Sequence, residues 1–574
     1  MKNFACYLLL ILIPFSANCS NEKDIHNQQI INLVAFSKSY GYIKYFHPLN
    51  ESSIIDWDKF LLYGIPKIVC CKNDDELRDS LTQLFRAITD RASFLSYKPD
   101  ANEGPTYRPS DTLFFHQYRG IKTSDRSYLQ FKDYQVKISN NSFIDSSLFS
   151  IIPNYHENYC KELVSGLFIN FPIVMRKDSN KWIIRNFDQQ INNDIRSQLN
   201  KEQIKSLADI ITFWNIVQHF YPYHNESGMD WEQTLKSTIE TVLNDPHDYN
   251  PDKYIFMLGK EMRDGHFRVE SNQKQGFYLP INLRLLNSIP IVIESFDTTI
   301  FKKGDVLLTI NHKPVSFLID SVKSYWSGSD EFINYWSGND IHRNQNSEVV
   351  TVELLRGEKV FSLSVKRAYF KGKPKSRFLD KGIYYCNLSD VNCNMDTIIS
   401  IANKTDALIL DWRNGSSIKL LVHRLFQHLS EDTLPPPFKF IIPQVVYPDH
   451  KFDTYYEPEQ FITPLKPRIR TKIVILSSPS NMSYQESIIK MAQLNNLATI
   501  VGETTGGVEG SINYSTLPSG LVVGWTGMKV VNLDGSQHHI KGIKPNILIT
   551  PTLGGLKAGK DEVLDNAIKY LRTN

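Results

Sequence analysis

The sequence predicts a multidomain α+β protein whose C-terminal part, residues 370–574, is an α/β core. A chain of 574 residues is too long for one hydrophobic core and predicts about three to four domains. Its 41% hydrophobic and 12% aromatic content is typical of a globular protein. Helical patterns dominate the N-terminal part and strand-like patterns the middle, and both alternate in the core.

The N-terminus, residues 1–19, predicts a targeting segment. Met1-Lys2 is a short basic start, and the apolar run at 7–15 is too short to span a membrane. The Ser-Ala-Asn-Cys sequence that ends at Cys19 is similar to a bacterial lipoprotein cleavage site. Lipidation of Cys19 would anchor the protein in the cell envelope, outside the cytoplasm. Ordinary signal-peptide removal would instead leave a periplasmic or secreted protein.

An internal repeat relates residues 20–95 to residues 199–272. The segment from Leu33, LVAFSKSYGYIKYFHPLNESSIIDWDKF, is echoed by the segment from Leu207, LADIITFWNIVQHFYPYHNESGMDWEQT. Each copy predicts a helix that stops at an aromatic-Pro turn and a second helix that opens near Asp-Trp. The aromatic residues either pack a duplicated helical module or bind a ligand. Residues 96–198 alternate like strands, and the sequence assigns them no role.

Residues 273–369 predict a small β domain. The stretch KKGDVLLTINHKPVSFLIDSVKSYW, residues 302–326, reads as a Gly-Asp turn, a buried strand, a polar turn and a helix. The runs VVTVELLRG and KVFSLSVKR then predict two strands joined through Gly357.

The most informative part of the core is KIVILSSPSNMSYQESIIKMAQLNNLATIVGETTGG, which contains Ser483. It predicts a buried strand from Lys472, a turn at 478–481, a helix from Met482, and a second strand that leads into a Gly-rich turn. A serine at such a junction lies where the N–H groups and positive dipole end of a helix can stabilise an oxyanion. Alternatively, Ser483 caps the helix and Glu486 completes a capping box.

Five motifs resemble, in their order, those of the C-terminal processing peptidases and their tricorn-like relatives, which are serine peptidases with a PDZ domain. They are Asp264-Gly-His266, Asp411-Trp-Arg413 with small residues after it, Ser483-Tyr-Gln-Glu486, Gly502-Glu-Thr-Thr-Gly-Gly507, and LDGSQHHIKGIKPNI at 533–547. They span about the last three hundred residues. The resemblance implies a crotonase-like core of ββα layers, a PDZ domain at 273–369 and Ser483 as nucleophile.

Two departures indicate the closer branch of that family. The processing branch has a lysine base in the turn where this chain has Val508, and valine cannot accept a proton. The tricorn-like branch uses the histidine of the Asp-Gly-His motif, which corresponds to His266. Late in the chain, where a glutamate is usual, this sequence has two histidines. The resemblance implies that His539 orients the base, with His538 or Glu509 as alternatives.

The residue types suit acyl transfer. A serine hydroxyl needs a base within hydrogen-bond reach, and a histidine, with a pKa of about 6.5, can accept the proton and then protonate the leaving amine. The candidate oxyanion donors are the N–H groups of Tyr484 and Gly415, with Asn414 and Ser416 as alternatives to the latter. On a purely structural interpretation, His266 is only a helix C-cap.

Composition argues against several other classes of protein. The net charge of +3 is small and spread along the chain, so no nucleic-acid partner is expected. No cofactor is expected, and the pair His538-His539 lacks further ligands at metal-binding spacing. Cys386 and Cys393 flank a short polar connection and could form a local disulfide.

Together these features predict an exported serine endopeptidase that hydrolyses proteins or peptides through an acyl-enzyme. One alternative is a non-catalytic, surface-anchored peptide-binding protein that retains the peptidase fold. The absent lysine and the histidine in place of glutamate favour that alternative. A third hypothesis is an esterase-type hydrolase that uses the same serine.

Overall fold

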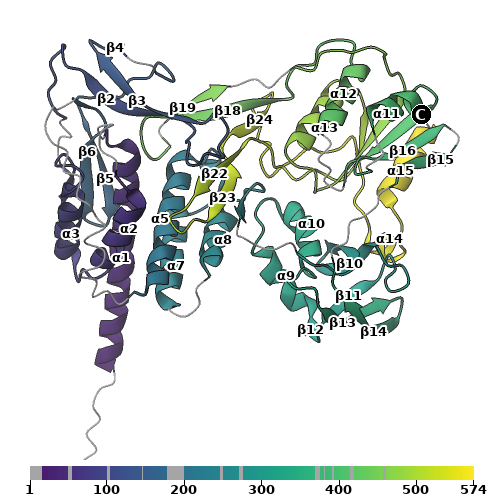
Figure 1. The fold of residues 1–574 in the computed structure, drawn as a ribbon, viewed down its shortest axis with the longest axis horizontal. Helices are drawn as coiled ribbons and strands as arrows, with labels where there is room; N and C mark the ends of the chain where they lie inside the picture. Colours follow the sequence, from purple (N-terminus) through teal and green to yellow (C-terminus); the bar gives the residue numbers. More distant parts are fainter. Residues whose placement is uncertain are drawn as a thin grey trace, which may run out of the picture. The chain divides into compact units, whose positions relative to one another are not determined.

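The computed structural model describes thirteen segments of the chain (Figure 1): residues 16–48, 55–99, 104–144, 147–176, 199–245, 250–270, 276–368, 375–380, 382–390, 394–413, 419–450, 452–456 and 461–573. The chain divides into two compact units. Unit 1 contains Met1–His116, Gln135–Asn215 and Leu235–Tyr249; unit 2 contains Gln117–Tyr134, Ile216–Thr234 and Asn250–Asn574. The predicted mixture of helices and several sheets is confirmed.

Unit 1 combines helices with small antiparallel sheets. Its elements are α1 (Ser16–Phe46), α2 (Trp57–Ile68), α3 (Asp74–Arg86), β1 (Ser93–Leu95), β4 (Ser142–Phe143), β5 (Asn158–Val164), β6 (Leu167–Pro172) and β7 (Met175–Arg176). Strands β1, β6 and β5 form a three-stranded sheet in that order. Phe36, Phe60 and Phe85 pack their rings together, so aromatic residues of all three helices form the core. The run NKWIIRNF at 180–187, part of the strand-like stretch predicted for residues 96–198, lies outside the described residues.

Four elements have residues in both units: β2 (Leu113–Arg119), β3 (Lys132–Ser139), α5 (Lys201–Phe220) and α7 (Trp231–Asn244).

The repeated helical pattern is confirmed. Helices α1 and α5 both end at the phenylalanine before the aromatic-Pro turn. In the first copy Asp56 caps α2 by accepting from the Lys59 N–H, and in the second Asp230 accepts from the Gln233 N–H of α7.

The candidate base, His266, lies in the first part of unit 2. This part contains α6 (His224–Ser227), α8 (Pro251–Glu261) and β8 (Arg268–Glu270). Strand β8 joins an antiparallel sheet in the order β22 (Ile512–Thr516), β23 (Val522–Thr526), β8. Gly524 pairs with Arg268 in this sheet, so two further residues along the same register bring Thr526 opposite His266.

Residues 276–368, called the middle module below, form an antiparallel sheet with two helices. The elements are β9 (Ile281–Leu286), β10 (Ile289–Ser295), β11 (Val306–Ile310), β12 (Lys313–Pro314), α9 (Val315–Lys323), α10 (Asp330–Asp340), β13 (Val349–Arg356) and β14 (Lys359–Lys366). The sheet order is β14-β13-β11-β10-β9, with β12 beside β11. The predicted strand, turn and helix at 302–326 and the two strands joined through Gly357 are confirmed.

The core of unit 2 contains the remaining elements: β15 (Arg377–Asp380), β16 (Ile383–Asn387), α11 (Met395–Ala402), β17 (Ala407–Asp411), α12 (Lys419–Leu429), β18 (Phe438–Val445), β19 (Phe452–Tyr456), β20 (Lys472–Ser477), α13 (Tyr484–Leu494), β21 (Thr499–Gly502), β24 (Lys529–Asn532), β25 (Ile547–Leu548), α14 (Leu553–Lys557) and α15 (Glu562–Thr573). The main sheet has the strand order β15-β16-β17-β20-β21-β25. Strand β15 pairs antiparallel with β16, and every other pair of neighbouring strands is parallel. Strands β18, β19 and β24 pair separately and antiparallel.

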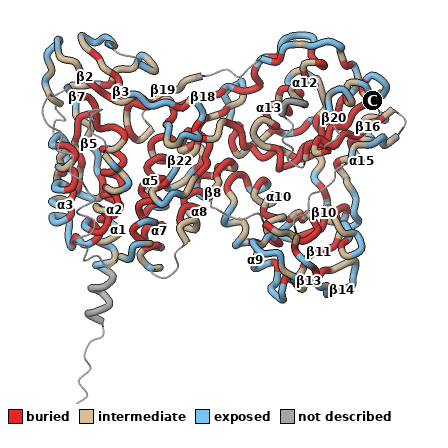
Figure 2. Tube along the Cα trace, viewed as in Figure 1, coloured by how far each residue is buried: buried red, intermediate tan, exposed pale blue. Residues whose placement is uncertain are grey.

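Both faces of the main sheet are covered. Alternate residues such as Leu410 and Ile475 pack with helices α11, α12 and α13, whereas Ile409 and Val474 pack with α15. Strands β17 and β20 are therefore buried along nearly their whole length (Figure 2). This explains their continuous apolar sequences, because a parallel strand covered on both faces has no solvent side.

Three predicted features fall at or beyond the edge of the described residues. Residues 1–15 and the side chain of Cys19 lie outside them, as does Cys393, the proposed disulfide partner of Cys386. Within the helices that the structure describes, none is both long and apolar enough to cross a membrane.

Candidate active site

Ser483 occupies the predicted junction between strand β20 and helix α13. Its backbone has φ 56° and ψ −136°, a conformation that non-glycine residues rarely adopt. The buried side chain of Asn481 holds the turn: its Oδ1 accepts from Ser478 N at 2.8 Å and its Nδ2 donates to Trp412 O at 2.9 Å. The serine is thus kept in a strained turn of the kind that presents a nucleophile at the end of a strand.

The alternative in which Ser483 merely caps α13 is wrong. Its side chain makes no capping hydrogen bond with the helix. The Glu486 carboxylate, fully buried, instead accepts from the N–H groups of Gly507 at 2.9 Å and Val508 at 2.7 Å, and from the Thr505 hydroxyl. Glu486 therefore organises the 505–508 turn rather than a capping box.

That turn connects Ser483 to the Asp-Gly-His loop. The Val508 carbonyl accepts a hydrogen bond from the Ser483 N–H. The Val508 side chain packs on Gly265, where an added Cβ would lie only 2.2 Å from Val508 Cγ2. Val508 thus brings the loop containing His266 against the backbone of the candidate nucleophile.

His266 is a buried residue beyond the end of helix α8. The helix ends at Glu261 with Met262 as C-cap, so the interpretation of His266 as a helix cap is wrong. The Nδ1 atom of His266 lies 2.9 Å from the Thr526 hydroxyl, and that hydroxyl donates to Asp264 Oδ1 at 2.7 Å. A continuous polar chain therefore runs from the imidazole through a hydroxyl to a carboxyl group.

The Asp264 carboxyl is surrounded by donors. Besides the hydroxyl, it accepts from Thr526 N at 2.6 Å and His266 N at 2.9 Å. Burial raises the pKa of Asp264, and the hydrogen bonds from Thr526 and His266 oppose that rise. Hydrogen bonds from three donors favour the ionised carboxylate at this position.

The two late histidines have different surroundings. His538 Nε2 lies 3.2 Å from Glu486 Oε2. His539 stacks on Tyr223, with ring centroids 3.9 Å apart and planes 12° apart. Burial, and after it the nearby charges of His538, Arg263, His266 and Lys529, together lower the pKa of His539 to about 3. His539 is therefore close enough to His266 for the two to interact electrostatically, and its ring is neutral at neutral pH.

Of the two candidate oxyanion donors, Tyr484 and Gly415, the structure describes only Tyr484. Tyr484 opens helix α13, and its hydroxyl lies 3.0 Å from His423 Nδ1. Gly415, like the alternatives Asn414 and Ser416, lies outside the described residues. The residue just before that segment, Arg413, is described, and its carbonyl accepts from the hydroxyls of Ser478, Ser480 and Tyr335.

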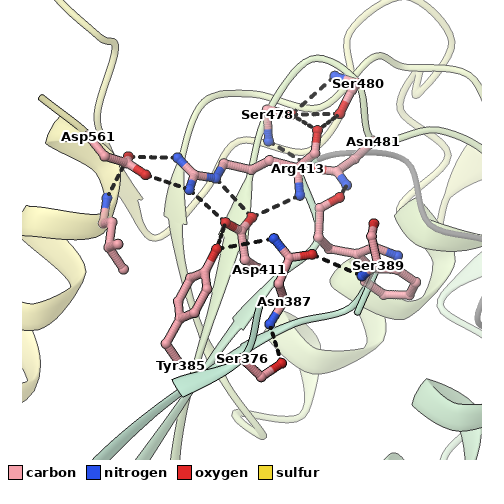
Figure 3. A network of polar contacts seen from close by, with 12 residues as sticks. Ser376, Tyr385, Asn387, Ser389, Asp411, Arg413, Ser478, Ser480, Asn481 and Asp561 are labelled. Carbon is pink, nitrogen blue, oxygen red and sulfur yellow. Dashed lines mark hydrogen bonds and ion pairs between the residues drawn. The ribbon is translucent and has the colours of Figure 1, made fainter. Parts of the chain in front are cut away.

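The side chain of Arg413 is also held by hydrogen bonds (Figure 3). Its guanidinium forms paired hydrogen bonds with Asp411 and with Asp561, at 2.7–2.9 Å. Burial alone would raise the pKa of Asp411, but the charge and hydrogen bonds of Arg413 hold it below its usual range. The Asp-x-Arg motif therefore anchors the start of the loop expected to carry an oxyanion donor.

Sequence reasoning missed Thr526 and the hydrogen-bonding role of Asp264. Thr526 is separated from His266 by 260 residues, and only the pairing of β8 with β23 brings them together. The Asp in Asp-Gly-His was a visible signal, but the sequence did not indicate its partner. Among the residues that the structure describes, no group of three or more His, Cys, Asp or Glu side chains could hold a metal ion.

Comparison with known proteins gives the class of the core. Residues 436–549 match the model of peptidase family S41, which includes Ser483 and His539. This match confirms the predicted resemblance and supports a serine-type peptidase, an enzyme class that acts on proteins or peptides. A comparison with curated proteins found no match.

Several solved structures are similar to this chain, among them one with a TM-score above 0.5. Mature CPAF in complex with lactacystin superposes with a TM-score of 0.52 and 14% identity, over 65% of this chain and 100% of CPAF. The photosystem II D1 C-terminal processing protease has a TM-score of 0.37 and 14% identity, over 64% of this chain and 99% of that protein. The tricorn protease has a TM-score of 0.35 and 13% identity, over 80% of this chain and 45% of that one. The similarity to CPAF supports the fold alone.

Proposed function

We propose that the protein is an exported serine endopeptidase in which Ser483 is the nucleophile and His266 the general base. The observation that carries the proposal is the strained backbone of Ser483 at a strand–turn–helix junction, held against the loop of His266 through Val508. Strain of this kind persists where the surrounding structure enforces it, and it is concentrated at active sites. A helix cap without a capping hydrogen bond would have no reason to keep it.

In the proposed reaction His266 Nε2 accepts the Ser483 hydroxyl proton as Ser483 Oγ bonds to the scissile carbonyl carbon. The carbonyl π electrons move to oxygen and give a tetrahedral oxyanion. That oxyanion collapses, the C–N bond breaks, and the imidazolium returns its proton to the leaving amine, which leaves an acyl-enzyme. A water molecule then repeats the sequence at the ester carbonyl, with His266 again as base, and releases the acid and free Ser483.

The oxyanion would be bound by the backbone N–H of Tyr484, with Gly415 as the proposed second donor. Tyr484 is the first residue of α13, so its N–H is at the positive end of the helix dipole. The fixed carbonyl of Arg413 supports the proposal for Gly415, because it restrains the chain two residues before that glycine.

We further propose that the middle module is a PDZ domain that controls access to the site rather than one that grips peptide ends. Its edge strand β9 is covered: Leu283 N donates to Asn339 Oδ1 of α10 at 2.8 Å, and a Cβ on Gly338 would lie 2.8 Å from Leu283 O. A peptide adds to a sheet through such edge groups. The module also shares a cavity of about 480 Å³ with the core, lined by Arg284, Tyr335, Arg413 and Glu503 among others.

Export and anchoring at Cys19 rest on the sequence of residues 1–19, and they remain part of the proposal. The test is incorporation of a labelled fatty acid into the full chain in a bacterial host. Labelling of the parent and its loss in Cys19→Ala would support the anchor. Equal labelling of both would exclude it.

The choice among peptidase, binder and esterase requires a turnover assay. We expect the purified protein to cleave casein or an unstructured peptide, and Ser483→Ala to leave both intact. Equal peptide survival with the two proteins would favour the non-catalytic binder. Turnover of a p-nitrophenyl ester without peptide cleavage, lost in Ser483→Ala, would favour the esterase.

A further inference from the structure

We propose that Thr526, backed by the Asp264 carboxylate, is the residue that positions His266, in place of the late acidic residue usual in the tricorn-like branch. The inference rests on the proposed function of His266 as general base. It gives a role to Thr526 and Asp264, which lie outside the predicted triad of Ser483, His266 and His539. His539 is then not the residue that orients the base.

The hydrogen-bond pattern fixes the tautomer of His266. A threonine hydroxyl has one proton to donate, and here it donates to Asp264 Oδ1 at 2.7 Å. The same oxygen can then only accept from His266 Nδ1, 2.9 Å away. Nδ1 therefore bears the proton, and Nε2 keeps the lone pair that a general base needs.

Further contacts hold both ends of the hydrogen-bonded chain that runs from Asp264 through Thr526 to His266. Asp264 receives the N–H groups of Thr526 and His266, while its own N–H donates to the Ser327 hydroxyl at 2.9 Å. Thr526 is the last residue of strand β23. This strand pairs with β8 as far as Arg268, two residues after His266. All three side chains are almost completely buried, so water does not compete for these hydrogen bonds.

This arrangement supplies what His539 lacks. A neutral imidazole offers no negative charge to an imidazolium, and burial keeps His539 neutral. Asp264 carries that charge, and the Thr526 hydroxyl transmits its effect by hydrogen bonding as the proton arrives on Nε2. A buried carboxylate next to the base thus exists, at a different place in the chain from the family's glutamate.

The test compares Thr526→Val, which keeps the shape but removes the hydroxyl, with Thr526→Ser, which restores it. Thr516→Val, an exposed position on β22, is the matched control. Peptide hydrolysis gives kcat and KM across a pH series. We expect Thr526→Val to lower kcat on the order of tenfold to a hundredfold with little change in KM, and to shift the acidic limb of the pH profile. Thr526→Ser and Thr516→Val should stay near the parent.

A second measurement reads the tautomer directly, whether or not the protein hydrolyses peptides. Nitrogen-15 NMR of histidine-labelled protein, with His266→Gln to identify the signal, should show a protonated Nδ1 in the parent and a loss of that preference in Thr526→Val. A parent with its proton on Nε2, or a Thr526→Val protein with parental tautomer and kcat, would overturn the positioning role. An inactive parent that shows the expected tautomers would instead refute the proposed function and keep the positioning role.

Discussion

At the scale of single residues, the site depends on contacts that a sequence motif does not reveal. Ser483 keeps a backbone conformation that costs on the order of 1–3 kcal/mol. Asn481 and Val508 hold that conformation from either side, one through the turn and one through the Ser483 N–H. The valine that excludes a Ser–Lys dyad thus has a structural role of its own.

The contact between Gly265 and Val508 can be tested by compensation. Gly265→Ala should lower peptide turnover strongly and stability by about 1–3 kcal/mol, because the new Cβ overlaps Val508 Cγ2. Adding Val508→Ala removes the overlapping methyl groups and should restore part of both losses. Turnover rates and urea unfolding of the single and double variants measure this. A double variant no better than Gly265→Ala would show that the packing contact does not join the two loops.

At the scale of secondary-structure elements, helix α10 connects the middle module to the site. Ser329, which caps it, donates to the Gly506 carbonyl at 3.0 Å, and Tyr335 donates to the Arg413 carbonyl at 2.9 Å. Its C-terminal end packs on the edge strand β9 through Gly338 and Asn339. Movement of α10 would therefore disturb the turn behind Ser483 and Arg413, the residue just before the proposed oxyanion loop, together.

Tyr335→Phe tests this link. It removes one of the three hydroxyls that donate to the Arg413 carbonyl, so we expect a severalfold lower kcat, on the order of 1 kcal/mol in transition-state stabilisation, with an unchanged fold. Tyr325→Phe, a half-exposed tyrosine just before the same helix, is the matched control and should match the parent. If the two variants have equal turnover, α10 does not act on the loop through Tyr335.

The elements themselves could largely be predicted from the sequence. Strands β17 and β20 are continuous apolar runs because both faces are covered, and α13 follows them after an evident turn. The pairing of distant segments could not be predicted. Thr526 reaches His266 only through the register of β8 with β23, and the strand β9 looks like a free edge until α10 is seen to cover it. Such contacts depend on long-range packing, which leaves no local pattern.

At the scale of the whole molecule, buried histidines make the fold sensitive to acid. Burial lowers the pKa of His47, His342 and His539 to about 3, from an ordinary value of 6.5. Between those values the unfolded chain binds more protons than the folded one. Their contribution to stability is therefore full above pH 6.5 and is lost progressively as the pH falls toward 3.

Urea unfolding at pH 7 and pH 4.5 measures this effect. We expect the free energy of unfolding to fall with pH, by up to about 2–3 kcal/mol for each such histidine at pH 4.5. His342→Gln should lose less stability on acidification than the parent, since glutamine does not titrate. A parent and variant with the same pH dependence would show that His342 is not buried in its neutral form.

Labelling with a fluorophosphonate tests most directly whether Ser483 is a nucleophile. Ser487, a buried serine one turn further along α13, provides the matched control as Ser487→Ala. We predict a single adduct that peptide mass spectrometry maps to Ser483, present in the parent and in Ser487→Ala and absent in Ser483→Ala. Labelling that survives Ser483→Ala, or a folded parent that takes up no label at all, would show that Ser483 is not the nucleophile.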